Sequence, residues 1–320
     1  MIREEGARNK VAAVTGGTGF LGRFIVAALI EAGWKVRLLV RSDPIHSLIP
    51  ELDTEIILGD LSDQAALERL CAGADAIIHA AGLIKAKNRD AFFSVNVEGS
   101  ANVAMSSAKV APNARLVVVS SLAAREPMLS DYAASKQAGE TAVLENAGGP
   151  VTILRPSAIY GRWDKETYPL FQMASKGFVF GPGADAARIC LVNVSDVSQA
   201  VVAFADTGDK NVTYELSDER VDGYTWTEIV ETAGKALKTR PRLVKVPPSL
   251  FKFGAFGAQI VSRGTGKIPI LTQGKVREIL HGDWSSSPGK QPPPEIWRPR
   301  INLLDGFSST VRWYRQENWL

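Results

Sequence analysis

The sequence predicts an α/β protein built on a doubly wound parallel sheet, with a smaller C-terminal lobe added to it. Short apolar runs rich in β-branched residues alternate with longer segments of helical periodicity, and this alternation loosens after Arg155. Runs that are apolar on both faces must be covered on both sides. The strands are therefore expected to be parallel, with helices crossing over each face of the sheet.

Each element of this sheet follows from a local pattern. Apolar, β-branched runs predict strands at Val11–Thr15, Val36–Val40, Glu55–Leu58, Ala76–His79, Leu116–Ser120 and Val151–Leu154. Helical spacing of apolar residues predicts helices at Leu21–Ala32, Gln64–Leu70, Phe92–Val110 and Tyr132–Asn146. Further along the chain, Ile189–Val194 and Asp196–Ala205 are expected to form one more strand and helix of the sheet, and Leu303–Trp319 a final helix.

Composition narrows the class of protein. The 320 residues are 45% hydrophobic and 22% charged with a formal net charge of +3, as in ordinary globular domains. Basic and acidic residues are mixed along the chain, which argues against nucleic acid as a partner. Cys71 and Cys190 have no His or second Cys at ligand spacing, so we expect two reduced core thiols and no metal. Residues 1–10 lack a secretory pattern and no apolar run reaches the length of a membrane span, which predicts a cytoplasmic location.

A glycine-rich loop, Thr15–Gly22, joins the first strand to the first helix. Its glycines fit two spacings, G-x-G-x-x-G and G-x-x-G-x-x-G, and the pattern alone does not choose between them. Both spacings allow the backbone to approach a pyrophosphate closely at the positive end of a helix. The loop therefore predicts a Rossmann-type dinucleotide site that includes Gly16, Gly17, Thr18, Gly19, Phe20, Leu21 and Gly22.

Arg41 bears on which dinucleotide is bound. An NAD site usually carries an acidic residue at the end of the second strand, where it binds the ribose hydroxyls. Here that strand ends in Arg41, whose guanidinium can pair with a 2′-phosphate. NADP(H) is therefore the preferred cofactor, while nearby Asp43 leaves NAD(H) open.

Tyr132 and Lys136 form the candidate proton-transfer pair. Their i,i+4 spacing places the phenol and the ammonium on one helix face, where a positive neighbour favours the phenolate. Ser121, at the end of the fifth strand, is expected to hold the substrate oxygen against Tyr132, with Ser120 as the less favoured alternative.

These motifs together resemble the short-chain dehydrogenase/reductase superfamily, in particular its extended branch of epimerases, dehydratases, dihydroflavonol-reductase-like and 3β-hydroxysteroid-dehydrogenase-like enzymes. The segments that carry the resemblance span nearly the whole chain: Thr15–Gly22, Gly59–Leu61, His79–Gly82, Asn96–Gly99, Val118–Ser121, Tyr132–Lys136, Arg155–Gly161, Val192–Asp196 and Trp297–Arg315.

The resemblance also implies roles for residues outside the glycine loop. It places Asp60 and Leu61 beside the adenine, Ala80, Ala81 and Gly82 along the cofactor, and Pro156 and Ser157 near the nicotinamide carboxamide. Asn96 is expected either near the active site or in a polar contact inside a helix. Homodimerisation through Phe92–Val110 and Tyr132–Asn146 is a further implication.

Two lobes that interleave in sequence are predicted. Residues 1–155 are expected to form the dinucleotide-binding domain, to which 189–217 return. Residues 156–188 and 218–320 are expected to form the substrate lobe. In this lobe six phenylalanines suggest an apolar pocket, although core packing explains them equally well: Phe171, Phe178, Phe180, Phe251, Phe253 and Phe256. Arg162, Lys176 and Arg188 are alternative candidates for holding a phosphate.

Three functions compete. The preferred one is an NADP(H)-dependent oxidoreductase that interconverts a carbonyl and a secondary alcohol of a small-molecule substrate. The second is an NAD-dependent nucleotide-sugar epimerase or dehydratase, which is disfavoured because Leu122–Ala124 follows Ser121 where the resemblance would place an acid in a dehydratase. The third is a dinucleotide-binding regulator or assembly subunit without catalytic activity, against which the intact Ser121, Tyr132 and Lys136 count.

Overall fold

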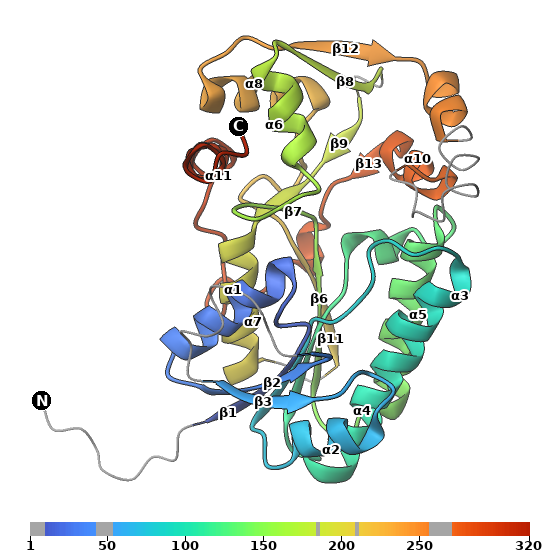
Figure 1. Ribbon diagram of the computed structural model, residues 1–320, viewed down its shortest axis with the longest axis vertical. Helices are drawn as coiled ribbons and strands as arrows, with labels where there is room; N and C mark the ends of the chain where they lie inside the picture. Colours follow the sequence, from blue (N-terminus) through green and yellow to red (C-terminus); the bar gives the residue numbers. More distant parts are fainter. Residues whose placement is uncertain (1–9, 43–53, 184–185, 209–210, 256–270) are drawn as a thin grey trace, which may run out of the picture.

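The central sheet has seven parallel strands in the order β11-β6-β5-β4-β1-β2-β3. The computed structural model, shown in Figure 1, describes residues 10–42, 54–183, 186–208, 211–255 and 271–320. The strands of the central sheet are β1 (Val11–Thr15), β2 (Lys35–Val40), β3 (Thr54–Leu58), β4 (Ala76–His79), β5 (Arg115–Val119), β6 (Val151–Pro156) and β11 (Val212–Leu216).

Helices cover both faces of this sheet, as Figure 1 shows. One face packs against α1 (Phe20–Glu31) and α7 (Val194–Asp206). The other packs against α2 (Gln64–Cys71), α4 (Gly99–Val110) and α5 (Asp131–Asn146). Along β2, Val36 and Leu38 lie in the first core and Leu39 in the second, as the two-residue period of a strand requires. The predicted doubly wound α/β fold is confirmed.

One predicted helix is not continuous. The segment expected as a single helix at Phe92–Val110 consists of α3 (Arg89–Phe93), a π-helical turn η1 (Ser94–Glu98) and α4. The turn carries Asn96, whose side chain bonds to the loop after β4 and to α5. The switch from α-helix to π-helix therefore occurs where the Asn96 side chain makes these tertiary hydrogen bonds.

The prediction that Ile189–Val194 forms a strand of the central sheet is wrong. This stretch forms β9 (Arg188–Ile189) and β10 (Leu191–Asn193), which pair with β13 (Asp283–Trp284) and β7 (Ala158–Tyr160) in two small sheets. The strand that joins the central sheet is β11, which pairs with β6. The expected helix at Asp196–Ala205 is present as α7 and packs against α1.

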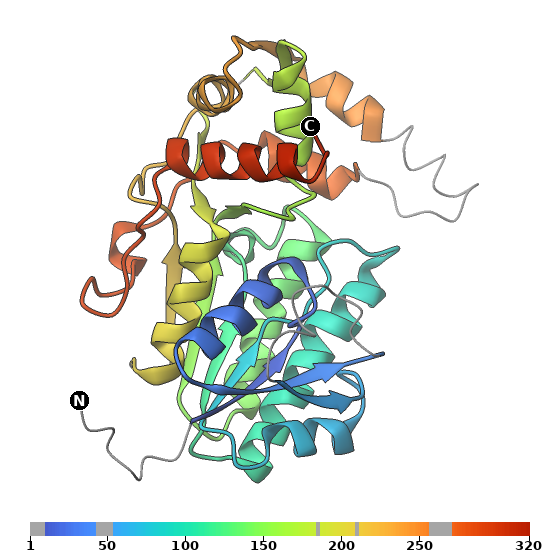
Figure 2. The same ribbon diagram turned by 60° about the vertical axis from the view of Figure 1, so that its left-hand side comes forward.

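The C-terminal lobe has its own core. Helices α6 (Tyr168–Ser175), α8 (Trp226–Leu237) and α11 (Leu303–Gln316) meet around Phe171, whose ring contacts the rings of Phe307 and Tyr314 edge to face. Figure 2 shows α11 lying across this lobe. The remaining elements are β8 (Phe178–Pro182), which pairs with β12 (Arg242–Val246), α10 (Gln273–Leu280) and two 3-10 turns, η2 (Leu122–Arg125) and η3 (Pro288–Lys290).

The structure also bears on the cysteines, on metal-binding clusters and on membrane-spanning helices. Cys71 and Cys190 are both buried free thiols, and burial raises the pKa of each to about 12. Among the described residues no cluster of His, Cys, Asp and Glu is arranged to bind a metal ion. None of the helices in the described part of the chain has both the length and the hydropathy of a membrane span.

Candidate active site

The predicted site residues gather at the carboxyl ends of β1, β4 and β5. The segments that follow β1 and β4 cross to opposite faces of the sheet, α1 to one and α3–η1–α4 to the other. Two adjacent strands whose connections diverge open a crevice between them, which is where sheets of this kind bind their ligands.

The glycine loop is packed too tightly for side chains. Gly16 has φ +75°, and a Cβ there would lie 2.5 Å from the Ala81 nitrogen. A Cβ on Gly22 would lie 2.0 Å from the Gly16 carbonyl oxygen. These glycines therefore bring β1, α1 and the loop after β4 together without intervening side chains.

The start of α1 is suited to bind an anion. Gly19 is the N-cap and supplies no side-chain hydrogen bond, and the first turn carries no acidic residue. The first N–H groups of the helix have no intrahelical partners and lie at its positive end. Arg23 adds a cation one turn later, where its Nε donates to the Gly19 carbonyl at 3.2 Å and its guanidinium lies 5.1 Å from the Trp163 ring. Thr18, Phe20 and Leu21 lie in this loop and first turn.

Arg41 and Asp60 are neighbours at the edge of the site. Arg41 is exposed just beyond β2, and Asp60 follows β3. Hydrogen bonds from the side chain and backbone of Ser62, with a contribution from the Arg41 charge, lower the pKa of Asp60. Leu61 is half-buried, and its carbonyl accepts a hydrogen bond from Asn102 at 2.8 Å. Asp43 lies outside the described residues.

A buried polar chain supports the loop after β4. His79 bonds through Nδ1 to the Thr15 hydroxyl at 2.8 Å and through Nε2 to the Ser100 hydroxyl at 2.9 Å. Burial, with a contribution from the Lys136 charge, lowers the pKa of His79 to about 3. This histidine is therefore neutral at physiological pH and links β1 and β4 to α4. The backbone nitrogen of Ala80 completes the contact by donating to the Thr15 carbonyl at 3.2 Å.

Asn96 joins this loop to α5. Its side chain accepts from the Leu83 backbone nitrogen at 2.7 Å, and donates to the Leu83 carbonyl at 3.0 Å and to the Ser135 hydroxyl at 2.9 Å. A Cβ on Gly82 would lie 3.2 Å from the Asn96 oxygen and 3.7 Å from Lys136 Nζ. Asn96 therefore makes a buried polar contact and, through Gly82, also lies beside Lys136, so that its position agrees with both expectations.

Tyr132 lies in the first turn of α5, which Ser130 caps by accepting from the Ala133 nitrogen at 3.0 Å. Burial raises the pKa of Tyr132 to about 12, while a hydrogen bond with Ser121 lowers it and the Glu278 carboxylate raises it. Ser121 is thus the serine whose hydroxyl meets the phenol. The high pKa means that the phenol is protonated at neutral pH and can donate its proton.

Lys136 follows one turn later on the same helix. Its Nζ donates to the Val119 carbonyl at 2.9 Å, which anchors it at the end of β5. Burial lowers its pKa to about 8, although the charge of Glu140 opposes this shift. An ammonium with a pKa this close to neutrality can exchange protons with its surroundings.

Sequence reasoning missed a buried ion pair behind the proton-transfer pair. Arg155 donates to both carboxylate oxygens of Glu140, at 2.9 and 2.6 Å, and Ser120 donates to the same carboxylate at 2.5 Å. Ser120 is therefore engaged away from Tyr132. Glu140 stands four residues after Lys136, a spacing that could have revealed it. Glu278 also went unnoticed, because it reaches Tyr132 from the C-terminal lobe.

Ser157 supplies a further test of whether the crevice fits a dinucleotide. Its buried hydroxyl has no hydrogen-bond partner, although Pro156 and Ser157 lie at the end of β6 beside the catalytic elements. Buried hydroxyls are normally satisfied, so this atom is suited to a ligand such as a carboxamide. Together with the tight glycine loop and the uncapped helix start, it fits the predicted cofactor.

Of the six phenylalanines considered for an apolar pocket, the five that the structure describes do not share one environment. Phe171 is in the lobe core, whereas Phe178, Phe180 and Phe253 are exposed. Phe251 is half-buried, and Phe256 lies outside the described residues. Core packing, the alternative explanation, therefore holds for Phe171, and Phe178, Phe180 and Phe253 do not line a pocket with it.

The three residues considered as phosphate ligands, Arg162, Lys176 and Arg188, each have other contacts in the structure. The guanidinium of Arg162 lies over the rings of Phe24 and Trp163, and Arg188 donates to backbone carbonyls of its own loop. Lys176 caps the end of α6.

Comparison with known proteins decides the family. Residues 12–217 match the model of the NAD dependent epimerase/dehydratase family. The chain belongs to this family. It is 45% identical to the ceramide reductase of Caulobacter vibrioides over 97% of this chain and 96% of that protein. It is 33% identical to the sterol demethylase protein B of Methylococcus capsulatus over 96% and 99% of the two chains.

The family's fold appears in a UDP-glucose 4-epimerase from Thermus thermophilus, solved in complex with NAD. That structure has a TM-score of 0.69 and 21% identity, and the match covers 96% of this chain and 99% of that one. The resemblance to the extended short-chain dehydrogenase/reductase branch is confirmed. This member of the family is an NAD(P)-dependent oxidoreductase.

Proposed function

We propose that this enzyme uses NADPH to reduce a ketone to a secondary alcohol on a long-chain lipid of the ceramide type. The observation that carries the proposal is the pairing of the Tyr132 phenol with the Ser121 hydroxyl, one helical turn from the half-buried Lys136. A ceramide is an N-acylated amino diol, and its secondary alcohol is the group that reduction of a ketone generates.

The chemistry follows from these side chains. The Ser121 and Tyr132 hydroxyls lie close enough to interact, and a carbonyl oxygen bound beside them would accept hydrogen bonds from both. NADPH bound in the crevice would supply the hydride to the carbonyl carbon. Tyr132 gives its proton to the carbonyl oxygen, so that the C=O group becomes CH–OH. Lys136 stabilises the resulting phenolate and helps to return a proton to it from solvent.

The residues around the crevice are assigned accordingly. The glycine loop, with the free N–H groups of α1, would hold the pyrophosphate. Leu61 and Asp60 would border the adenine, Ala80, Ala81 and Gly82 would line the cofactor, and Ser157 would bond to the carboxamide with Pro156 shaping that end. Arg41 would pair with the 2′-phosphate, which is why we propose NADPH in preference to NADH.

The lipid class is supported by the two relatives described above, whose names refer to a ceramide and a sterol. The contacts of Arg125, which follows β5, also argue against a sugar diphosphate as the substrate. Arg125 donates to the carbonyls of Ser285 and Asp283 at 2.7 and 2.6 Å, which leaves fewer donors for a diphosphate. The three residues directly after Ser121 include no acid, and two of them, Leu122 and Ala124, are buried apolar residues. We therefore rank the nucleotide-sugar epimerase or dehydratase second.

A homodimer through α4 and α5 is also proposed. These helices lie side by side, and each exposes a large apolar residue, Met105 on α4 and Leu144 on α5. Apolar side chains on adjacent exposed helices favour burial against a second copy.

Substrate assays test the proposed reaction. We expect oxidation of NADPH when purified protein is mixed with an N-acylated 3-oxo long-chain base in detergent micelles, and none with UDP-glucose. Mass spectrometry should find the corresponding lipid alcohol in equal amount to the NADP⁺ formed. Turnover of the UDP-sugar without net change of the dinucleotide would instead establish the epimerase.

A further inference from the structure

The small β8/β12 sheet has one exposed, apolar face. Phe178 and Phe180 on β8 are 37% and 51% exposed, and their ring centroids are 5.3 Å apart. Val244 on β12 pairs in register with Phe180 and is 40% exposed. The intervening Val179 is buried in the core of the lobe. One face of this sheet is therefore covered by the lobe and the other is open.

A second apolar surface continues from it. Helical residues 248–255 follow β12 directly, and both figures place this helix beside the β8/β12 sheet, at the end of the lobe away from the central sheet (Figures 1 and 2). Leu250 and Phe253 on this helix are 58% and 72% exposed. We call the exposed side chains of Phe178, Phe180, Val244, Leu250 and Phe253 the apical patch.

Positive charge surrounds the apical patch. Residues 235–253 contain six Lys or Arg residues and no Asp or Glu, in a chain whose net charge is only +3. Arg242 pairs in register with Phe178 and so lies on the same face of the sheet, and Lys252 stands beside Phe253 in the helix. Two of these six cations, Arg242 and Lys252, therefore lie beside the exposed apolar side chains.

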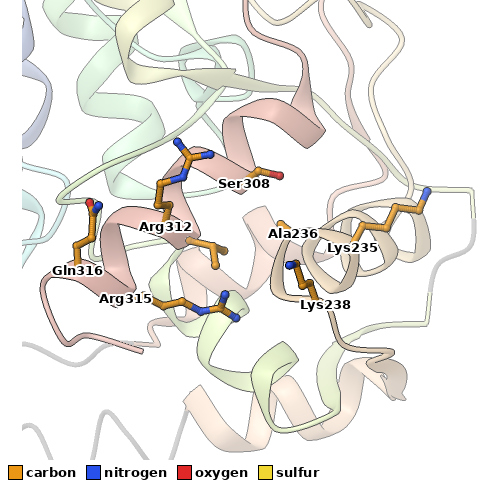
Figure 3. A pocket seen from close by; sticks show the side chains of 8 residues that line it. Lys235, Ala236, Lys238, Ser308, Arg312, Arg315 and Gln316 are labelled. Atoms are coloured by element: carbon orange, nitrogen blue, oxygen red, sulfur yellow. The ribbon is translucent and has the colours of Figure 1, made fainter.

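The same lobe also holds a cationic pocket, shown in Figure 3. It lies between α8 and α11 and has a volume of about 530 Å³. Its lining includes Lys235, Lys238, Arg312 and Arg315 and no acidic residue. These cations extend the positive field of the lobe beyond the apical patch.

We propose that the apical patch docks on the surface of an anionic phospholipid bilayer. Exposed aromatic and aliphatic side chains enter the boundary between headgroups and acyl chains, and flanking Lys and Arg residues bind the anionic headgroups. The patch and the basic residues beside it, Arg242 and Lys252, combine both features. A second copy of this chain fits less well, because two such faces would bring like charges together.

This inference goes beyond the proposed reaction. Docking requires neither cofactor nor substrate, so that binding to vesicles can succeed or fail whatever the enzyme reduces. If both proposals hold, docking delivers the enzyme to the bilayer in which a lipid ketone resides.

Vesicle sedimentation of the full chain tests the proposal. We expect the protein to sediment with vesicles of phosphatidylcholine and phosphatidylglycerol, and about tenfold less with phosphatidylcholine alone. The double variant F180S/F253S should lower the partition coefficient at least tenfold. Arg242→Gln should lower it about fivefold, and added salt should weaken binding to the anionic vesicles.

Matched controls separate docking from unfolding and from self-association. Leu304→Ser removes an exposed apolar residue of α11, and Lys35→Gln removes an exposed charge of β2, and neither should change the partition coefficient. All variants should keep wild-type affinity for NADPH. Equal binding of wild type to both vesicle types, or unchanged binding by F180S/F253S, would overturn the proposal. So would self-association, measured by light scattering, that F180S/F253S abolishes.

Discussion

Replacing Arg41 by alanine should weaken the binding of NADPH and leave the binding of NADH nearly unchanged. Arg41 lies just beyond β2 and close enough to Asp60 to contribute to lowering the pKa of that carboxyl. A 2′-phosphate in the proposed site would meet the guanidinium, whereas a plain ribose would offer it no anion.

The size of the effect follows from the exposure of Arg41. A hydrogen bond to a charged group contributes roughly 1.5–3 kcal/mol, and solvent around an exposed guanidinium favours the lower end. About 1.4 kcal/mol corresponds to a tenfold change in affinity. We therefore expect the dissociation constant for NADPH to rise about tenfold and the constant for NADH to change less than twofold.

Titration of cofactor fluorescence measures both constants. Lys35→Ala, at the opposite end of β2, removes the same charge from an exposed position and serves as the control. The difference between NADPH and NADH should diminish at high salt in the wild type. An equal loss of affinity for both dinucleotides in the Arg41 variant, or the same loss in the Lys35 variant, would refute the assignment of Arg41.

Three further predictions concern the loop, the phenol and the buried histidine. Gly22→Ala places a Cβ 2.0 Å from a backbone oxygen of the glycine loop, so NADPH affinity by fluorescence titration should fall at least tenfold, while Gly289→Ala, in open space, should not alter it. Glu278→Gln removes a charge that raises the pKa of Tyr132, so the rate of alcohol oxidation should reach its plateau at lower pH; an unchanged profile would contradict this. Burial lowers the pKa of His79 to about 3 in the folded state, so this group stabilises the fold above pH 6.5 and the contribution is lost as pH falls toward 3. Between pH 7 and 5 the loss amounts to about 2 kcal/mol, which urea unfolding should detect in the wild type and find absent in His79→Gln.

Local patterns predicted much of this protein. The strands of the central sheet are apolar runs whose periodicity is visible in the sequence, and the glycine loop is recognisable from its spacing within eight residues, Thr15–Gly22. Tyr132 and Lys136 share one helix, so their proximity follows from the helical repeat.

Contacts between segments far apart in the chain could not be predicted from local sequence patterns. The pairing of β9 with β13 joins residues 188–189 to 283–284. Each strand has only two residues, which is too short for a sequence pattern to predict the pairing. The charge of Glu278 acts on Tyr132 from another lobe. The π-helical turn at Asn96 belongs to this class too, because it accompanies hydrogen bonds to Leu83 and Ser135.

Transfer of deuteride tests the central claim most directly. Purified enzyme would be mixed with an N-acylated 3-oxo long-chain base and NADPH carrying deuterium at the transferred position of the nicotinamide. We expect one deuterium on the carbinol carbon of the lipid product, at a rate that falls about 10²- to 10⁴-fold in Tyr132→Phe while NADPH still binds. A product without deuterium, or a Tyr132→Phe variant as fast as the wild type, would contradict it.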